Sequence, residues 1–247
     1  MNQDPTRASA APFMARTTSF VRRGMRMTRS QARAWERLAD RYVLPFDHAE
    51  GSTTVAEGQR IDLDSLREEV GQAGGVVVEI GTGTGDQIVH AARTHPECLF
   101  LGFEVWRPGI AQALMKADDA GVTNLRFIEA DAEQALPILL PAGAVAEVWT
   151  FFPDPWRKTR HHKRRLVKPT FASAVANVLQ PGGIWRLATD WRSYATDMIH
   201  VLAAHPDFDL YSRGRFAGRT LTKFEERAQR EGRFPFDLTA VRRRGDE

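Results

Sequence analysis

The sequence VVVEIGTGTGD at residues 76–86 decides the fold class of this chain. Its first five residues form a nearly continuous apolar run, as in strands that a parallel sheet buries on both faces. Glycine then recurs at every second position, which allows a tight turn with positive φ and lets a ligand approach the backbone. Asp86 opens a segment that is predicted to be helical as far as Arg93. A strand, a glycine turn and a helix in this order predict the first unit of a parallel α/β sheet.

The same alternation of strand and helix continues toward the carboxyl end. Further strands are predicted at residues 99–104, 125–130, 146–152 and 184–189, and further helices at residues 108–120, 131–140, 168–179 and 191–203. Residues 208–211 and 236–241 are predicted to supply a closing pair of strands. This spacing predicts the α/β fold class, with a doubly wound, mostly parallel, seven-stranded sheet and helices on both faces.

Basic residues are concentrated at the two ends of the 247-residue chain, although its formal net charge is only +3. Residues 1–41 hold nine Arg against three acids, and residues 211–244 hold ten Lys or Arg against four acids. Charge that is distributed in this way predicts a polyanionic partner, and it favours nucleic acid over a membrane surface.

The chain is predicted to have three parts: a disordered leader at residues 1–18, a basic segment with helices at residues 19–70, and the main domain at residues 71–247. The single cysteine, Cys98, excludes an internal disulfide and a thiolate zinc site, and no metal is expected. No apolar run approaches the roughly 18 residues of a membrane span. Because no secretory signal is recognised either, we expect a cytoplasmic protein without membrane association. Its oligomeric state is expected to be a monomer or a homodimer.

Acidic residues are predicted to gather where the first three strands end. Glu79 lies near the end of the first strand, Glu104 ends the second, and Asp131 follows the third. A carboxylate at the end of the second strand can accept both ribose hydroxyls of an adenosine. Asp131 is placed either to meet an adenine edge or to cap the following helix. A nicotinamide fingerprint would need glycine at position 86, and no lysine follows the loop as a P-loop requires. The pattern therefore favours a different nucleoside-containing cofactor.

The fourth predicted strand runs into the sequence FFPDPWRK at residues 151–158. Proline fixes φ and has no backbone N–H, so it interrupts helices and the hydrogen bonds between strands. Pro153-Asp154-Pro155 is therefore predicted to be a stiff turn. A carboxylate at the carboxyl end of a strand lies where open α/β sheets bind ligands. Residues 157–168 then contain seven Lys or Arg and no acid. We expect either a rigid loop beside a solvated basic face or a site that joins a ligand to a polyanion.

The glycine loop and the strand-end acids together resemble the class I S-adenosylmethionine-dependent methyltransferases, whose sheet is Rossmann-like. In that family the glycine loop passes under the methionine part of the cofactor, and the acid of the second strand holds the ribose. The resemblance implies S-adenosyl-L-methionine as the cofactor. It implies cofactor contacts at Glu79, Gly81, Gly83, Gly85, Glu104, Asp131 and Asp154.

The signature of the tRNA (guanine-N7-)-methyltransferases is similar to four parts of this chain: residues 151–165, Thr189-Asp190-Trp191 with Tyr194, Thr222-Lys223-Phe224-Glu225 with Arg227, and the basic stretch of residues 19–28. Enzymes of this family transfer a methyl group from S-adenosyl-L-methionine to N7 of a guanine in the tRNA variable loop. The resemblance therefore implies a tRNA-modifying enzyme whose partner is tRNA.

The same resemblance assigns roles to particular residues, with Asp154 as the catalytic one. Substrate contacts are implied at Lys158, Asp190, Thr222, Lys223, Phe224 and Glu225, and RNA contacts at Arg160, His161, His162, Lys163, Arg164 and Arg165. Taken alone, Lys223 and Glu225 are also consistent with a surface pair without a role. Two other functions stay open. One is a class I methyltransferase acting on another RNA or on protein, and the other is a non-catalytic RNA-binding protein with a methyltransferase-like fold.

Overall fold

The computed structural model describes residues 18–20, 24–49, 53–71, 74–211, 214–221 and 223–244. The predicted leader lies outside the described residues except for Thr18, as do residues 21–23 and Thr222. The disorder predicted for the leader therefore stays a prediction.

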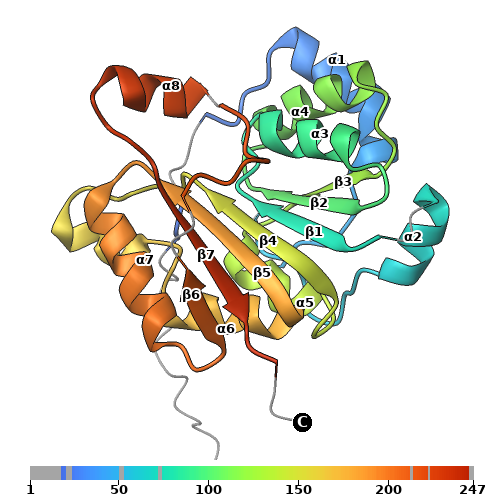
Figure 1. The fold of residues 1–247 in the computed structure, drawn as a ribbon. Coiled ribbons are helices and arrows are strands. Elements are labelled where there is room, and N and C mark those ends of the chain that lie inside the picture. Colours follow the sequence, from blue (N-terminus) through green and yellow to red (C-terminus); the bar gives the residue numbers. More distant parts are fainter. Residues whose placement is uncertain are drawn as a thin grey trace, which may run out of the picture.

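Within the described residues, the strands form one seven-stranded sheet in the order β3-β2-β1-β4-β5-β7-β6 (Figure 1). They are β1 (Val76–Ile80), β2 (Leu99–Glu104), β3 (Leu125–Glu129), β4 (Val145–Phe151), β5 (Leu179–Thr189), β6 (Phe208–Tyr211) and β7 (Phe236–Arg242). Neighbours from β3 to β5 pair in parallel, whereas β7 runs antiparallel between β5 and β6. The predicted doubly wound, mostly parallel sheet with its closing pair of strands is confirmed.

Helices cover both faces of this sheet (Figure 1). One face carries α1 (Arg29–Tyr42), α3 (Asp86–Thr94) and α4 (Arg107–Asp119), and the other carries α2 (Leu63–Val70), α5 (Ala132–Leu139), α6 (Pro169–Val178) and α7 (Arg192–Ala204). A short 3-10 helix, η1 (Thr159–Arg164), follows β4. Helix α8 (Lys223–Arg230) precedes β7 and lies beyond the edge of the sheet at which β7 begins (Figure 1).

The amino-terminal helices begin at caps that the sequence carries, and they pack as part of the same domain. Thr28 Oγ1 accepts from the Gln31 N–H at 3.2 Å while Gln31 Oε1 accepts from the Thr28 N–H at 2.8 Å, a capping box that starts α1. Asp62 caps α2 by accepting a backbone N–H at 3.0 Å. The hydroxyl of Tyr42, at the end of α1, donates to a backbone carbonyl just after α4 at 2.9 Å. Helix α1 is therefore fastened to the same face as α3 and α4.

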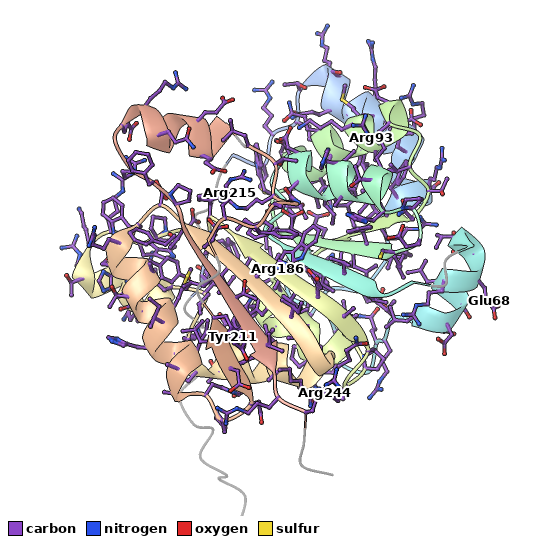
Figure 2. All side chains as sticks on the ribbon, in the orientation of Figure 1. Glu68, Arg93, Arg186, Tyr211, Arg215 and Arg244 are labelled. Carbon is purple, nitrogen blue, oxygen red and sulfur yellow. The ribbon has the colours of Figure 1, made fainter. Side chains whose placement is uncertain are left out.

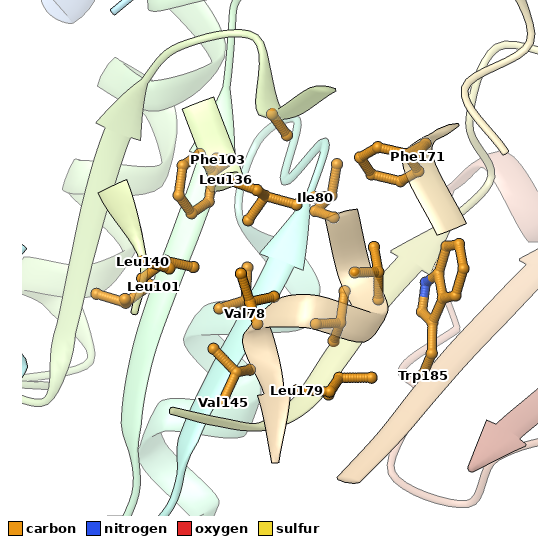
Figure 3. Close-up of a cluster of buried hydrophobic side chains, with 14 of the residues drawn as sticks. Val78, Ile80, Leu101, Phe103, Leu136, Leu140, Val145, Phe171, Leu179 and Trp185 are labelled. Carbon is orange, nitrogen blue, oxygen red and sulfur yellow. The ribbon is translucent and has the colours of Figure 1, made fainter. Parts of the chain in front are cut away.

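Apolar side chains between the sheet and its helices hold the strands in place. Figure 3 shows part of this core, where Ile80 of β1 lies between Leu136 of α5 and Phe171 of α6. Trp185 of β5 is fully buried beside them, and its indole N–H donates to Thr150 Oγ1 of β4 at 3.0 Å. Because such an interior is close-packed, the ends of β1, β4 and β5 form a rigid base for the loops that follow them.

Two elements differ from the sequence prediction. β5 begins at Leu179 instead of Ile184, so the predicted turn at residues 181–183 lies inside it. Its pairing with β4 shifts between Val145 and Glu147, and this irregularity accommodates the turn-forming residues. Helix α8 escapes sequence prediction because its sequence, KFEERAQR, has only two apolar residues, Phe224 and Ala228, among six polar ones.

Candidate cofactor and catalytic site

The glycine loop after β1 borders open space. Gly81, Gly83 and Gly85 have φ of 77°, 56° and 76°, a region that favours glycine. A Cβ at Gly81 or Gly83 would meet no atom within 4 Å, whereas a Cβ at Gly85 would lie 2.5 Å from Ala113 Cβ of α4. The first two glycines therefore leave room for a ligand beside the backbone, and the third permits the packing of α4.

Glu79 is a buried acid at the base of this loop. The residue is 4% exposed, and within the described part of the chain its Oε2 makes no hydrogen bond. Burial, followed by the negative charges of Glu104 and Asp86, raises the pKa of the Glu79 carboxyl well above its usual value. Because a buried carboxylate is costly without a counterion, this position suits a positively charged group of a ligand.

Glu104, at the end of β2, closes the glycine loop. Its Oε2 accepts from the Gly83 N–H at 2.7 Å, and its Oε1 accepts from the N–H groups of Val105 at 2.8 Å and Trp106 at 3.0 Å. These bonds hold the carboxylate directly beside the loop and fix the loop to β2.

Asp131 caps α5, which was one of its two predicted roles. Its Oδ1 accepts from the Glu133 N–H at 3.1 Å, and the residue is 4% exposed. Its own N–H donates to Thr53 O at 2.8 Å, so the connector before α2 reaches the edge of the sheet. The contact with an adenine edge stays a prediction.

The turn after β4 is framed by strained aromatic residues. Phe152 and Trp156 stand on either side of Pro153-Asp154-Pro155 with φ of 51° and 44°. A bulky residue in this region costs about 1–3 kcal/mol and persists only where its surroundings hold it, typically at functional sites. The Phe152 N–H donates to Ala188 O of β5 at 2.8 Å. The turn therefore keeps the partly buried Asp154 in a fixed place.

The amino-terminal segment lies along the same edge of the sheet. The indole N–H of Trp156, after β4, donates to Ser19 O at 3.1 Å, and that of Trp106, after β2, donates to Gly24 O at 3.0 Å. Since β1 lies between β2 and β4 in the sheet, these anchors stand on either side of the glycine loop. The segment before α1 thus reaches the rim of the candidate site.

The basic tract surrounds η1 and is only partly exposed. The Arg164 guanidinium lies 4.9 Å from the centroid of the Trp156 ring, and His161 contacts the same ring edge-on at 6.0 Å. Desolvation, followed by the charges of neighbouring Arg and Lys residues, lowers the pKa of His161 and so disfavours its protonated form. The exposed cations of the tract are Arg157, Lys158, Arg160 and Lys163, and the guanidinium of Arg157 lies 4.8 Å from the centroid of the Trp191 ring.

Arg165 is buried, which corrects its prediction as an RNA-binding residue. It is 2% exposed, and its guanidinium donates to Pro155 O at 3.0 Å and Ser193 Oγ at 2.9 Å and is paired with Asp197. Arg165 therefore fastens the Pro-Asp-Pro turn to α7 instead of facing a phosphate. The neighbouring His162 is partly buried as well.

Asp190 follows β5 and is paired with an arginine that sequence reasoning missed. Its Oδ2 accepts from Arg233 Nε at 2.7 Å. Donation to Asp190 and to Glu231 raises the pKa of Arg233 above its ordinary value. No local pattern could have signalled this contact, because Arg233 is one of several arginines in its stretch and lies 43 positions from Asp190.

The T-K-F-E motif can be placed only in part. Thr222 and the side chains of Lys223 and Phe224 lie outside the described residues. Glu225 is 1% exposed and accepts from Arg219, so the alternative that makes it part of a surface pair is wrong. Sequence reasoning also missed Arg219, whose nearest chain neighbours contain no acid.

The predicted acids are brought to one edge of the sheet, because each follows the carboxyl end of a parallel strand. In the pairing of β1 with β4, Ile80 lies opposite Thr150, so the glycine loop and the Pro-Asp-Pro turn begin side by side. Among the described residues, no group of three or more His, Cys, Asp or Glu is arranged to hold a metal ion. In the same part of the chain, no helix is long and apolar enough to cross a membrane. The glycine loop, the strand-end acids and the Pro-Asp-Pro turn thus lie together at one edge, and the basic tract follows the turn.

Comparison with solved structures places this fold among known ones. The 16S rRNA (adenine(1408)-N(1))-methyltransferase from Catenulisporales acidiphilia, solved with its cosubstrate SAM, aligns with a TM-score of 0.53 at 18% identity over 79% of this chain and 96% of that one. TrmN from Thermus thermophilus aligns with a TM-score of 0.51 at 21% identity over 72% of this chain and 47% of that one. A family model described as "Putative methyltransferase" matches residues 73–238. The fold and the site thus define a Rossmann-like methyltransferase of class I.

Curated relatives narrow this class to one family. The tRNA (guanine-N(7)-)-methyltransferase of Paenarthrobacter aurescens is 41% identical over 86% of this chain and 70% of its own length. The enzymes of the same name from Cutibacterium acnes and Alkalilimnicola ehrlichii are 45% and 42% identical, over 90% and 94% of this chain and 81% and 95% of their own lengths. The chain belongs to the tRNA (guanine-N(7)-)-methyltransferase family.

Removal of the Glu79 charge should stabilise the protein when no cofactor is bound. An acid whose pKa is raised by folding is protonated in both states at low pH, and it costs stability as the pH rises from its unfolded toward its folded pKa. Each unit of that difference is worth about 1.4 kcal/mol. We therefore expect Glu79→Gln to raise Tm at neutral and alkaline pH, with a gain that disappears as the pH falls through the ordinary range of Glu.

Thermal unfolding of wild type and variant across this pH range measures the effect. Glu129→Gln is the matched control, because Glu129 ends β3 but is paired with Arg107 at 2.7 Å, so that its replacement should not stabilise. A gain in Tm for Glu79→Gln that is independent of pH would contradict the assignment.

Proposed function

We propose that this chain transfers a methyl group from S-adenosyl-L-methionine to N7 of a guanine in the tRNA variable loop. One observation carries the proposal: in a chain 41% and 45% identical to enzymes of that name, the glycine loop and the Asp154 turn leave adjacent strands at neighbouring points. A methyl donor bound at the loop would then lie next to a carboxylate and a basic surface.

The residues around the glycine loop fit this cofactor. When bound, S-adenosyl-L-methionine supplies an electrophilic methyl group on a positively charged sulfonium. The open backbone at Gly81 and Gly83 leaves room for its methionine part. Glu79, whose Oε2 makes no hydrogen bond among the described residues, suits a cationic group of that part, and Glu104 is proposed to accept the ribose hydroxyls. Asp131 is proposed to lie beside the adenine.

Guanine N7 requires no general base, because it carries an in-plane lone pair and no proton. The transfer places positive charge on the guanine, and the fixed carboxylate of Asp154 can stabilise that charge or accept hydrogen bonds from N1–H and the exocyclic amine. Asp190, which Arg233 holds at 2.7 Å, suits the same task from the end of β5. Correct placement of the base should supply most of the remaining rate.

The exposed cations around η1 suit the phosphates of tRNA, which would make binding strongly dependent on salt. Lys158, Arg160 and Lys163 are exposed, whereas Arg164 and His161 lie against Trp156. By resemblance, Thr222, Lys223 and Phe224 remain proposed substrate contacts. The proposed setting is the cytoplasm, with the enzyme acting as a monomer or homodimer.

A map of the transferred methyl group tests the proposal. Purified protein is incubated with an unmodified tRNA transcript and S-adenosyl-L-methionine labelled at the methyl group, and the product is mapped by nuclease digestion and mass spectrometry. We expect N7-methylguanine at one position of the variable loop. Methyl at another position, or only on ribosomal RNA or protein, would favour the other class I activity. Binding of tRNA and cofactor without transfer would favour a non-catalytic protein.

Replacement of Asp154 by Asn should separate chemistry from binding. The variant keeps the shape of the side chain but removes the charge, so kcat should fall by about 10²-fold or more. The Kd for tRNA should stay within a few-fold of wild type, since phosphate contacts dominate RNA affinity. Steady-state kinetics and binding titrations measure both, with the exposed Asp64→Asn of α2 as control. An Asp154→Asn enzyme with wild-type kcat would remove this residue from the mechanism.

The double variant Lys158→Ala, Lys163→Ala should weaken tRNA binding and make it less dependent on salt. If each lysine contacts one phosphate, the slope of log Kd against log salt should fall by about 2. The matched control is Arg243→Ala, Arg244→Ala, which removes the same charge at the opposite edge of the sheet, where Figure 2 shows Arg244. Equal effects of the two double variants would mean that only net charge matters.

A further inference from the structure

Arg219 is a buried arginine on the segment of residues 214–221 that precedes α8. It is 2% exposed, and its guanidinium donates to Asp237 Oδ1 at 3.1 Å and Oδ2 at 2.9 Å. It is also paired with Glu225, which is as deeply buried and which accepts from Arg215 Nε at 3.2 Å. Figure 2 shows Arg215 near the ends of β4 and β5 at which the candidate site lies. Arg219, Glu225 and Asp237 are thus paired away from water, and the exposed Arg215 adds a second cation from the surface.

The same guanidinium lies against the aromatic residues that lead into the Pro-Asp-Pro turn. Its carbon is 5.1 Å from the ring centroid of Phe152 and 5.9 Å from that of Phe151, a range in which a cation is attracted to a ring face. Phe152 has a φ of 51°, which a bulky residue keeps only when its surroundings hold it. Arg219 is therefore one of the groups that hold Phe152, two residues before Asp154.

The position of Arg219 is itself set by the helix that begins at the glycine loop. Gln87, the second residue of α3, is 4% exposed. Its Nε2 donates to Gly218 O at 2.9 Å, and its Oε1 accepts from the Thr220 N–H at 2.6 Å. The side chain of Gln87 thus bonds to the residues on both sides of Arg219 and holds this part of the segment against the helix that follows the glycine loop. The segment thereby connects the loop, the turn and α8.

A second arginine of similar kind touches the same segment and provides a comparison. Arg186 of β5 donates to both oxygens of Glu147, at 2.7 and 2.9 Å, and its guanidinium lies 4.0 Å from the ring centroid of Phe216. Like Arg219, Arg186 donates to both oxygens of one carboxylate and lies against an aromatic ring. Its partners lie on β4 and on the segment instead of on the turn.

We propose that Arg219 is a positioning residue for the methyl transfer. It fixes the strained Phe152 and thereby the place of Asp154 relative to the glycine loop, with Glu225 and Asp237 as its counterions. The inference rests on the proposed function, because it uses the role of Asp154 in the transfer. It also gives Glu225 a role inside the protein, in place of the direct substrate contact that the family resemblance implies.

Arg219→Lys tests the proposal, because lysine keeps the charge but loses the planar fork. Misplacement of Asp154 should lower kcat by about tenfold to a hundredfold. The KM for tRNA should stay within about threefold, since the exposed cations that are proposed to bind tRNA are untouched. Arg186→Lys is the matched control and should keep kcat within about twofold. Circular dichroism and thermal unfolding show that each variant is folded at the assay temperature.

A double-mutant cycle with Phe152→Leu identifies the path of the effect. If Arg219 acts through the ring of Phe152, Arg219→Lys lowers kcat no further once Phe152 is replaced. An unchanged kcat in Arg219→Lys, equal losses in Arg219→Lys and Arg186→Lys, or additive losses in the cycle would each overturn the proposal. If Arg219→Lys does not fold, Glu225→Gln removes the charge of its counterion and enters the same cycle.

The wild-type enzyme is measured beside the variants, which separates this inference from the proposed function. A wild type that methylates a position other than guanine N7 refutes the proposed substrate. The ratios of kcat within the cycle still decide whether Arg219 places Asp154.

Discussion

Parallel pairing of β1 with β4 is the constraint on which the candidate site depends. Since Ile80 lies opposite Thr150, the glycine loop and the Pro-Asp-Pro turn leave the sheet at adjacent points. Both strands are packed between helices on two faces, so neither can slide without breaking a close-packed core. The β2 acid, Glu104, then closes the loop from one side, and the end of β5 supports the turn from the other. A cofactor and a nucleobase bound at these two places would meet above the same pair of strands.

Locally unfavourable features gather at this edge, and the rest of the domain sustains them. The buried Glu79 has a carboxyl oxygen, Oε2, that makes no hydrogen bond in the described structure, while Phe152 and Trp156 hold positive φ. Each such strained residue costs about 1–3 kcal/mol in a domain whose net stability is typically on the order of 5–15 kcal/mol. Features of this size persist where function requires them, and the buried cluster around Arg219 helps to maintain one of them. The position of the Pro-Asp-Pro turn therefore depends on the surrounding packing as well as on the two prolines of the turn.

Prediction from sequence was most successful where a local pattern reports directly on structure. Continuous apolar runs located β1 to β4, and α1 begins at a capping box that the local residues Thr28 and Gln31 form. Prediction failed at the start of β5, where long-range pairing with β4 overrode the turn tendency of residues 181–183. It failed again at α8, whose polar sequence carries no apolar stripe. For the site, spacing along the chain was enough to place acids at strand ends, because parallel strands share one carboxyl edge.

Local sequence was thus enough to predict the succession of strands along the chain, the glycine loop and the charged turn. The resemblance to the family rests on the same local motifs. Which charged residues are exposed was not readable, because burial depends on contacts between segments that are far apart in the chain. Arg165 and Glu225 resemble surface charges in the sequence but are 2% and 1% exposed in the fold. Arg219 reaches Asp237 across 18 positions, and Arg233 reaches Asp190 across 43. Only tertiary packing brings such partners together, so only the folded chain distinguishes the exposed cations from those that are buried beside the Pro-Asp-Pro turn.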